Sequence, residues 1–188
     1  MSNRTEIRIA GFGGQGVVLA GYVLGKAAAI HSGKYATLTQ SYGPESRGSA
    51  CSAQVILSDG EIFYPALIKP DVVLVMSQEA ESKFAGQIKE GGIVLYDSSL
   101  VTPSSDEVNY LGIPATEIAS GLGKKIVANM IMLGFLANQT KVITLDSLRQ
   151  TVAEVVAKQH LELNMKALYA GYSYVPGQPI FTIKQEKT

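Results

Sequence analysis

The stretch Ile7-Arg8-Ile9-Ala10-Gly11-Phe12-Gly13-Gly14-Gln15-Gly16-Val17-Val18-Leu19-Ala20 decides the fold of this chain. It runs from an apolar strand pattern through a glycine-rich turn into a helix-forming segment, an order typical of α/β domains. Gly11, Gly13 and Gly16 satisfy the G-x-G-x-x-G spacing, in which small residues permit a tight turn and close approach of a ligand to the backbone. The helix that follows would add its positive N-terminal dipole. The stretch therefore predicts a loop that binds an anionic group such as a phosphate, and we expect a side chain at Gly13 to block close approach or to require a positive φ.

The residues after this loop do not carry the signature of a nicotinamide cofactor. A dinucleotide-binding unit usually has Asp or Glu about 20 residues further on, at the end of the second strand, to bind a ribose hydroxyl. No acidic residue occurs between Glu6 and Glu45, and the second predicted strand, residues 34–39, ends in Gln40-Ser41. The loop thus predicts a phosphate cradle without dinucleotide recognition.

Composition limits the classes of function. A chain of 188 residues that is 46% hydrophobic and 17% charged indicates one ordered globular core. Sixteen basic and sixteen acidic side chains cancel, so broad attraction to nucleic acid or to an anionic membrane is not predicted. The polar start, residues 1–6, lacks the pattern of a cleavable signal, and we expect a cytoplasmic protein.

Metal and redox chemistry within the chain is limited by its few ligating side chains. Cys51 is the single cysteine, which excludes an intrachain disulfide, a four-cysteine iron–sulfur site and a cysteine-rich zinc site. Its place in an alternating strand pattern favours a small buried side chain over a reactive thiol. His31 and His160 lie too far apart in sequence to indicate a metal cluster, so no metal site is predicted.

The segment Ile126–Ala137 is almost entirely apolar, with Asn129 as its one polar residue. It falls short of the roughly 18–20 residues that a membrane span requires, so we predict no membrane insertion. A helix that is apolar on all faces is buried in a core or covered by another subunit, and the sequence leaves both open. A homodimer of the isolated chain is one way to cover it.

The order of elements predicts a three-layer α/β fold with a mostly parallel, Rossmann-like sheet and a helical C-terminal third. We expect a single domain over residues 1–175, followed by a tail or partner-docking arm over residues 176–188. The expected strands lie at 5–10, 34–40, 50–57, 71–76 and 93–96, with a hairpin return at 61–64. The expected helices lie at 15–31, 78–87, 123–138, 145–158 and 160–170.

A second polar segment, residues 40–49, follows the second predicted strand. Tyr42 offers a flat face and a hydroxyl, Glu45 and Ser46 add polar groups, and Arg47 could bind a phosphate or carboxylate through two parallel hydrogen bonds. Loops at the carboxyl ends of strands line the ligand crevice of an open α/β sheet, so both segments could face one cleft. Asp97, at the end of another buried strand, either lines this cleft or caps the segment that follows.

The two motifs together, Gly11–Gly16 and Gln40–Gly48, resemble the gamma subunit of 2-oxoacid:ferredoxin (acceptor) oxidoreductases, and the resemblance covers most of the chain. Ser49 stands where the family pattern usually has a second glycine. Enzymes of this family use thiamine diphosphate and Mg²⁺ to decarboxylate a 2-oxoacid, iron–sulfur clusters to remove the electrons, and coenzyme A to capture the acyl group. This chain lacks the Gly-Asp-Gly and paired-Asn signature for thiamine diphosphate, and it has one cysteine.

The resemblance therefore implies a non-autonomous subunit that works with alpha and beta subunits, a ferredoxin-like delta subunit in some complexes, and ferredoxin as the acceptor. No catalytic residue is expected in this chain alone, and 2-oxoglutarate is the favoured 2-oxoacid. The residues expected near coenzyme A, near the cofactor or at the subunit junction are Gly11, Gly13, Gly14, Gln15, Gly16, Tyr42, Glu45, Ser46 and Arg47. Contact with coenzyme A and a purely structural junction both remain open. The alternative function is a stand-alone nucleotide-binding or interaction protein.

Overall fold

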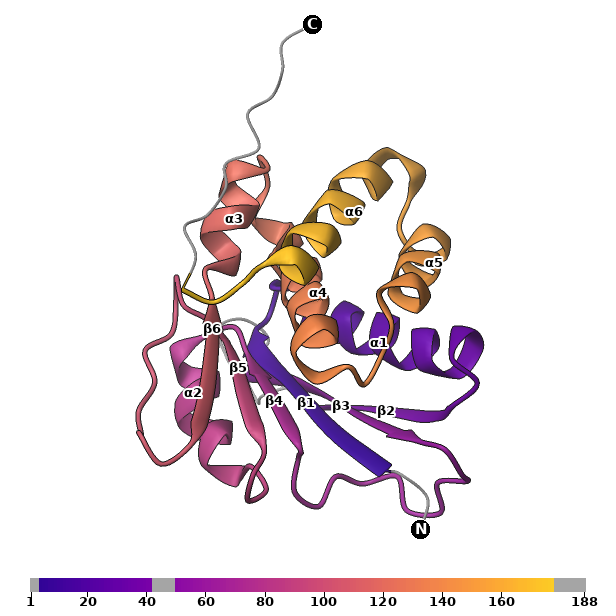
Figure 1. Ribbon diagram of the computed structural model, residues 1–188, viewed down its shortest axis with the longest axis vertical. Coiled ribbons are helices and arrows are strands. Elements are labelled where there is room, and N and C mark those ends of the chain that lie inside the picture. Colours follow the sequence, from indigo (N-terminus) through magenta and orange to yellow (C-terminus); the bar gives the residue numbers. More distant parts are fainter. Residues whose placement is uncertain (1–3, 42–49, 178–188) are drawn as a thin grey trace, which may run out of the picture.

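A computed structural model describes residues 4–41 and 50–177 of the chain (Figure 1). Its sheet has the strand order β2-β3-β1-β4-β5-β6. The strands are β1 (Arg4–Phe12), β2 (Tyr35–Ser41), β3 (Ala50–Ser58), β4 (Val72–Val75), β5 (Ile93–Asp97) and β6 (Asn109–Ile113). The helices are α1 (Val17–His31), α2 (Gln78–Phe84), α3 (Ala115–Gly121), α4 (Ala128–Thr140), α5 (Leu145–Val155) and α6 (Lys158–Ser173), with short 3₁₀ turns at Ala85–Gln87 and Lys125–Val127.

The sheet is mostly parallel, as predicted. Strands β1, β4, β5 and β6 pair in parallel, whereas β3 pairs antiparallel with both of its neighbours, β1 and β2. Strand β2 therefore runs in the same direction as β1, and β3 is the one reversed strand of the six that the structure describes. Strand β1 lies between β3 and β4 in the middle of the sheet.

Helices cover both faces of the sheet, which confirms the three-layer arrangement. On one face, Ile9, Leu74 and Leu95 pack into a core with α1 and the C-terminal helices. On the other face, Val75 and Val94 pack against α2. This alternation follows from the period of two along each strand, because consecutive side chains point to opposite faces. Figure 1 shows α1, α4, α5 and α6 gathered on the first side and α2 on the second.

Helix α4 lies at the centre of the larger core. Residues Val127–Ala137 are all buried by the chain itself, so a second subunit is not needed to cover them, and only Ile126 of the predicted apolar segment is exposed. The helix can lie this deep because α6 crosses it at backbone distance through two glycines. A Cβ built on Gly134 would lie 2.1 Å from the Leu168 carbonyl oxygen, and one on Gly171 would lie 1.8 Å from that of Ile131. No helix in the described residues is both long enough and apolar enough to cross a membrane.

Several sequence predictions are wrong in detail. The hairpin return at 61–64 does not form, because both edges of β3 are already taken by β1 and β2. Strand β6 and helix α3 were not predicted, since each is short and only partly buried. Helix α5 ends at Val155 and helix α6 begins at Lys158, whereas the sequence predicted the break between them after residue 158. The predicted tail lies outside the described residues from position 178 onward.

The Gly134–Gly171 crossing supports a first prediction. We expect Gly171→Ala to lower the free energy of unfolding by about 3 kcal/mol or more, because the added methyl group overlaps a backbone carbonyl that cannot move independently of α4. Gly121→Ala in α3 is the control, since a Cβ there meets nothing within 4 Å. Urea denaturation followed by circular dichroism measures both changes. Equal stability of the two variants would contradict this account of the crossing.

Candidate functional site

The glycine loop, residues 11–16, lies at the topological switch point of the sheet. Strands β1 and β4 are parallel neighbours, but the helix after β1 packs on one face and the helix after β4 packs on the other. In open α/β sheets the ligand crevice lies at such a point, outside the carboxyl ends of the strands. The loop predicted from sequence is therefore positioned where this fold places its ligands.

The side chain of Gln15 forms hydrogen bonds at the carboxyl ends of both β1 and β4. Its Oε1 accepts a hydrogen bond from the Phe12 backbone N–H at 2.7 Å, and its Nε2 donates to the Met76 carbonyl oxygen at 2.7 Å. Met76 immediately follows β4, so the side chain of Gln15 joins the carboxyl ends of β1 and β4. Both the oxygen and the nitrogen of the Gln15 amide have hydrogen-bond partners within the chain, and these bonds stabilise the conformation of the glycine loop. It was predicted as a cofactor-proximal residue, and its contacts within the chain are structural.

The glycines of the loop differ in what they do. Gly11 is packed tightly, since a Cβ there would lie 2.5 Å from Gln15 Oε1 and 3.1 Å from Met76 Cβ. Gly16 has φ +75°, and a Cβ there would lie 2.3 Å from Asn129 Nδ2. Gly14 has φ +96° and open space around it. Gly13 does not have a positive φ, so that expectation is wrong, and a Cβ there would meet nothing within 4 Å among residues 4–41 and 50–177.

Asn129 connects α4 to the glycine loop, a contact that sequence reasoning missed. Its Nδ2 donates to the Gly16 carbonyl oxygen at 3.2 Å, and its Oδ1 accepts from the Met130 N–H at 2.8 Å. It is buried, which is unusual for an amide in an apolar helix unless its polar atoms are paired. The signal in the sequence was this single polar residue in the apolar segment.

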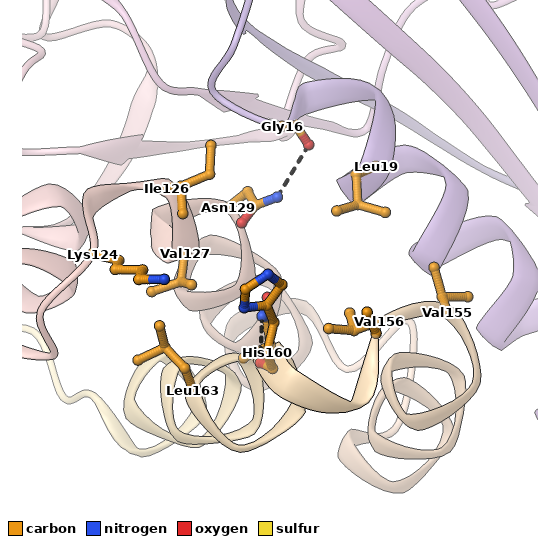
Figure 2. A pocket seen from close by; sticks show the side chains of 12 residues that line it. Gly16, Leu19, Lys124, Ile126, Val127, Asn129, Val155, Val156, His160 and Leu163 are labelled. Carbon is orange, nitrogen blue, oxygen red and sulfur yellow. Dashed lines mark hydrogen bonds between the residues drawn. The ribbon is translucent and has the colours of Figure 1, made fainter.

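A pocket of about 410 Å³ adjoins Gly16 (Figure 2). It lies between the start of α1, the segment before α4, the turn between α5 and α6, and α6 itself. Its walls are mainly apolar, and its polar side chains are Lys124, Asn129, His160 and Asn164. Figure 2 shows the His160 ring standing inside the pocket and the Lys124 side chain extending along its rim. Within the described part of the chain, the Lys124 amine forms no ion pair or hydrogen bond, which leaves a cation available at the rim of this pocket.

The second predicted segment begins and ends beside the glycine loop. Tyr42, Glu45, Ser46 and Arg47 lie outside the described residues. However, Ser41 pairs with Ser52, which pairs with Ala10, and Ala50 pairs with Phe12. The chain therefore leaves and re-enters the sheet at the edge that carries the glycine loop, which is consistent with a shared cleft.

Two buried carboxylates near this edge are used within the fold. Asp97 accepts hydrogen bonds from the Ser99 N–H and from the N–H and hydroxyl of Thr116. It therefore caps the segments that follow, which was one of the two roles predicted for it. Glu81 accepts from Ser104 and from the Tyr110 hydroxyl, both at 2.6 Å. Burial alone would raise the pKa of Glu81, but hydrogen bonds from Ser104 and Tyr110 outweigh it and hold that pKa below its ordinary value.

Cys51 is buried next to the loop, where it pairs with Gly11 across two strands. The burial of this side chain confirms the prediction of a small buried residue, and it raises the pKa of the thiol. Among residues 4–41 and 50–177, no group of three His, Cys, Asp or Glu residues is arranged to hold a metal ion.

Comparison with known proteins assigns this arrangement to a family. The family model described as pyruvate ferredoxin/flavodoxin oxidoreductase matches residues 6–174. The chain belongs to this family. It is 46% identical over 174 residues to the 2-oxoglutarate synthase subunit KorC of Methanocaldococcus jannaschii, an alignment that covers 90% of this chain and 92% of KorC.

Two solved structures share the fold of this chain. The gamma subunit of a keto/oxoacid ferredoxin oxidoreductase from Geobacter sulfurreducens is 39% identical, with a TM-score of 0.82 over 90% of this chain and 95% of that one. A 2-oxoglutarate:ferredoxin oxidoreductase from Magnetococcus marinus, solved with 2-oxoglutarate, coenzyme A and succinyl-CoA bound, has a TM-score of 0.78 at 23% identity. The match covers 89% of this chain but 30% of the Magnetococcus chain. The resemblance predicted from the two motifs is confirmed.

The Gln15 contacts support a second prediction for this oxidoreductase family member. We expect Gln15→Ala to lower the free energy of unfolding by about 1–3 kcal/mol, because the Phe12 N–H and the Met76 carbonyl lose their partner. Gln159→Ala is the matched control, since that side chain is exposed on α6. Thermal and urea unfolding of the two isolated variants measure the difference. A Gln15→Ala chain as stable as the control would show that the amide does not hold the two strand ends together.

Proposed function

We propose that this chain is the gamma subunit of a heteromeric, cytoplasmic 2-oxoglutarate:ferredoxin oxidoreductase. The complex would convert 2-oxoglutarate oxidatively to an acyl-CoA, CO₂ and reduced ferredoxin. The observation that carries this proposal is the near full-length similarity to the 2-oxoglutarate synthase subunit KorC. The alignment covers 90% of this chain and 92% of KorC, so the comparison rests on nearly all of both sequences.

The chemistry of such a complex requires groups that other subunits would supply. Thiamine diphosphate with Mg²⁺ would activate the 2-oxoacid, and iron–sulfur clusters would take up electrons one at a time. The alpha and beta subunits, with a ferredoxin-like delta subunit in some complexes, are the proposed partners, and ferredoxin is the proposed acceptor. A stand-alone nucleotide-binding or interaction protein is not favoured, because the chain belongs to the oxidoreductase family.

Within the complex, the glycine loop would face the coenzyme A site or the adjoining subunit junction. Gly13 and Gly14 are exposed and have open space at their Cβ positions, so another molecule can approach the backbone there. No side chain caps the first turn of α1, and anions favour such a terminus. The Lys124 amine, on the rim of the pocket that Gly16 also lines, adds positive charge. These features fit an anionic ligand such as the phosphates of coenzyme A, and the Magnetococcus enzyme is one relative described with coenzyme A bound.

The proposed function is tested by affinity purification of the tagged chain from its native host, with mass spectrometry of the proteins that co-purify. We expect a thiamine-diphosphate-binding subunit and a cluster-bearing subunit, and 2-oxoglutarate-dependent reduction of ferredoxin by the recovered complex. The isolated chain should show no such activity. Partners unrelated to 2-oxoacid metabolism, or turnover by the isolated chain, would contradict the proposal.

The role of the loop is tested by comparing Gly13→Val with Gly16→Ala. Because a Cβ on Gly13 would meet no atom of the described residues within 4 Å, Gly13→Val should leave the unfolding temperature of the isolated chain unchanged but lower activity of the complex by roughly tenfold or more. Gly16→Ala should instead destabilise the isolated chain by about 1–3 kcal/mol, because of its positive φ and its contact with Asn129.

Steady-state kinetics then separate the two roles left open for the loop. A raised KM for coenzyme A in the Gly13→Val complex would indicate contact with coenzyme A, whereas weaker subunit association would indicate a junction. Full activity of that complex would contradict both roles.

A further inference from the structure

The pocket that adjoins Gly16 is apolar on most of its surface and large enough for a small organic molecule. Its volume of about 410 Å³ lies within the range of roughly 300–1,000 Å³ that is typical of ligand sites. Figure 2 shows apolar side chains on both sides of the His160 ring, namely Leu19, Ile126, Val127, Val155, Val156 and Leu163. Such walls favour an apolar group over water. A small hydrophilic anion such as inorganic phosphate would leave them without a partner.

Lys124 adds one positive charge to this pocket, and no acidic side chain in the described part of the chain lines it. Other lysines, such as Lys26 and Lys89, form ion pairs with acidic side chains. The Lys124 amine extends along the rim in Figure 2. A single amine balances a ligand with one negative charge, and it is too little for a group of several phosphates.

Asn164 supplies a further polar group that the fold leaves unused. The residue is 9% exposed, and its Nδ2 donates to the His160 carbonyl oxygen at 2.8 Å. Its Oδ1 has no hydrogen-bond partner among the residues that the structure describes. Polar atoms of buried side chains are normally paired with protein, ligand or ordered water. The Asn164 side chain, which lines the pocket, is therefore available to an occupant that the chain itself does not supply.

The N-termini of two long helices support the same sign of charge. Gly16 precedes α1 and Ala157 precedes α6, and both residues line the pocket. Neither residue caps its helix through a side chain, and neither helix has an acidic residue in its first turn. The backbone N–H groups at such an end carry a partial positive charge, which adds to that of the Lys124 amine.

We propose that this pocket binds a small organic monocarboxylate with an apolar body, such as a phenyl ring or a branched aliphatic chain. The carboxylate would lie at the Lys124 amine, and the apolar body would lie between Leu19 and Leu163. Gly13 and Gly14, at the exposed tip of the glycine loop, do not line the pocket. The ligand site is therefore distinct from the loop tip, and its existence does not depend on the proposed function.

Occupation of the pocket would regulate coenzyme A binding, and this part of the inference rests on the proposed function. The Lys124 amine is one of the groups assigned above to the phosphates of coenzyme A, and a bound carboxylate would neutralise its charge. Asn129 also lines the pocket and donates to the Gly16 carbonyl oxygen, so the ligand would contact a residue that holds the glycine loop. A bound carboxylate would therefore weaken the binding of coenzyme A.

Binding is measured by heteronuclear NMR on the isolated full-length chain, with 3-phenylpropionate as the probe. Its neutral analogue, 3-phenylpropionamide, has nearly the same shape and lacks the charge. We expect saturable binding of the acid with a Kd of about 1 mM or lower, and shifts of the backbone amides of Gly16, Asn129 and His160. The amide should bind about threefold more weakly or worse.

Lys124→Met tests the assigned charge, and Lys125→Met is the matched control because Lys125 is exposed but does not line the pocket. Lys124→Met should weaken binding of the acid by about threefold or more, and the control should leave it unchanged. Both variants should unfold at the wild-type temperature, since exposed side chains contribute little to folding. In the purified complex, 3-phenylpropionate at about ten times its Kd should raise the KM for coenzyme A by about twofold or more.

The outcomes separate this inference from the proposed function. No saturable binding below about 20 mM, equal affinity for acid and amide, or an unchanged affinity in Lys124→Met would overturn the ligand site. Shifts of the same residues by coenzyme A but not by 3-phenylpropionate would assign the pocket to coenzyme A, which overturns the inference and leaves the proposed function standing. Binding of the probe by a chain that co-purifies with no thiamine-diphosphate-binding subunit would support the ligand site while the proposed function fails. An unchanged KM for coenzyme A would overturn the regulatory part.

Discussion

The close crossing of α4 and α6 determines how deep the central helix lies, and the rest of the structure follows from that depth. Helix α4 is apolar on all sides and can be stable only where the sheet and other helices cover it completely. Gly134 and Gly171 remove the side chains that would keep the two helices apart. Once α4 is seated, Asn129 at its start reaches the Gly16 carbonyl. The packing of the core is in this way connected to the shape of the loop at the sheet edge.

The glycine-rich motif combines structural and open positions. Neighbouring atoms leave no room for a side chain at Gly11 or Gly16, whereas a Cβ on Gly13 would meet none of the described residues within 4 Å. The Gln15 side chain joins the carboxyl ends of β1 and β4 through hydrogen bonds to backbone groups of Phe12 and Met76. The described part of the chain therefore offers an exposed loop tip and a shallow pocket with a cationic rim, and its buried carboxylates are engaged in structural hydrogen bonds. This arrangement suits a subunit that contributes one wall of a site completed by other polypeptides.

Much of the fold could be predicted because its main signals are local. Continuous apolar runs such as Val72–Val75 indicate strands buried on both faces, and the glycine motif marks the first strand-to-helix turn. Strand β6 could not be predicted, because its few apolar residues are interrupted by Gly112 and it lies at an edge of the sheet. The return strand at 61–64 was predicted wrongly because its alternation is local, whereas occupancy of β3 by β1 and β2 depends on distant segments.

In the candidate site, too, local features could be predicted from the sequence and contacts between distant segments could not. The loop and its place at the carboxyl edge followed from residue types and spacing. The partners of Gln15 and Gly16 did not, since Met76 and Asn129 lie far from them in sequence and reach them only through the tertiary fold. A single polar residue in an apolar helix indicates a paired buried group, but it does not indicate which group is its partner.

The central position of β1 has a consequence for the order of folding. This strand precedes the other described strands in the chain, yet its neighbours in the sheet are β3 and β4 and not β2, the next strand along the sequence. Contacts between such distant segments delay productive pairing, because the loop entropy is lost before the contacts are made. During synthesis the apolar side chains of β1 would therefore have no sheet partner until β3 has emerged from the ribosome. The nascent chain is exposed to aggregation during that interval, although the finished sheet encloses β1 on both sides.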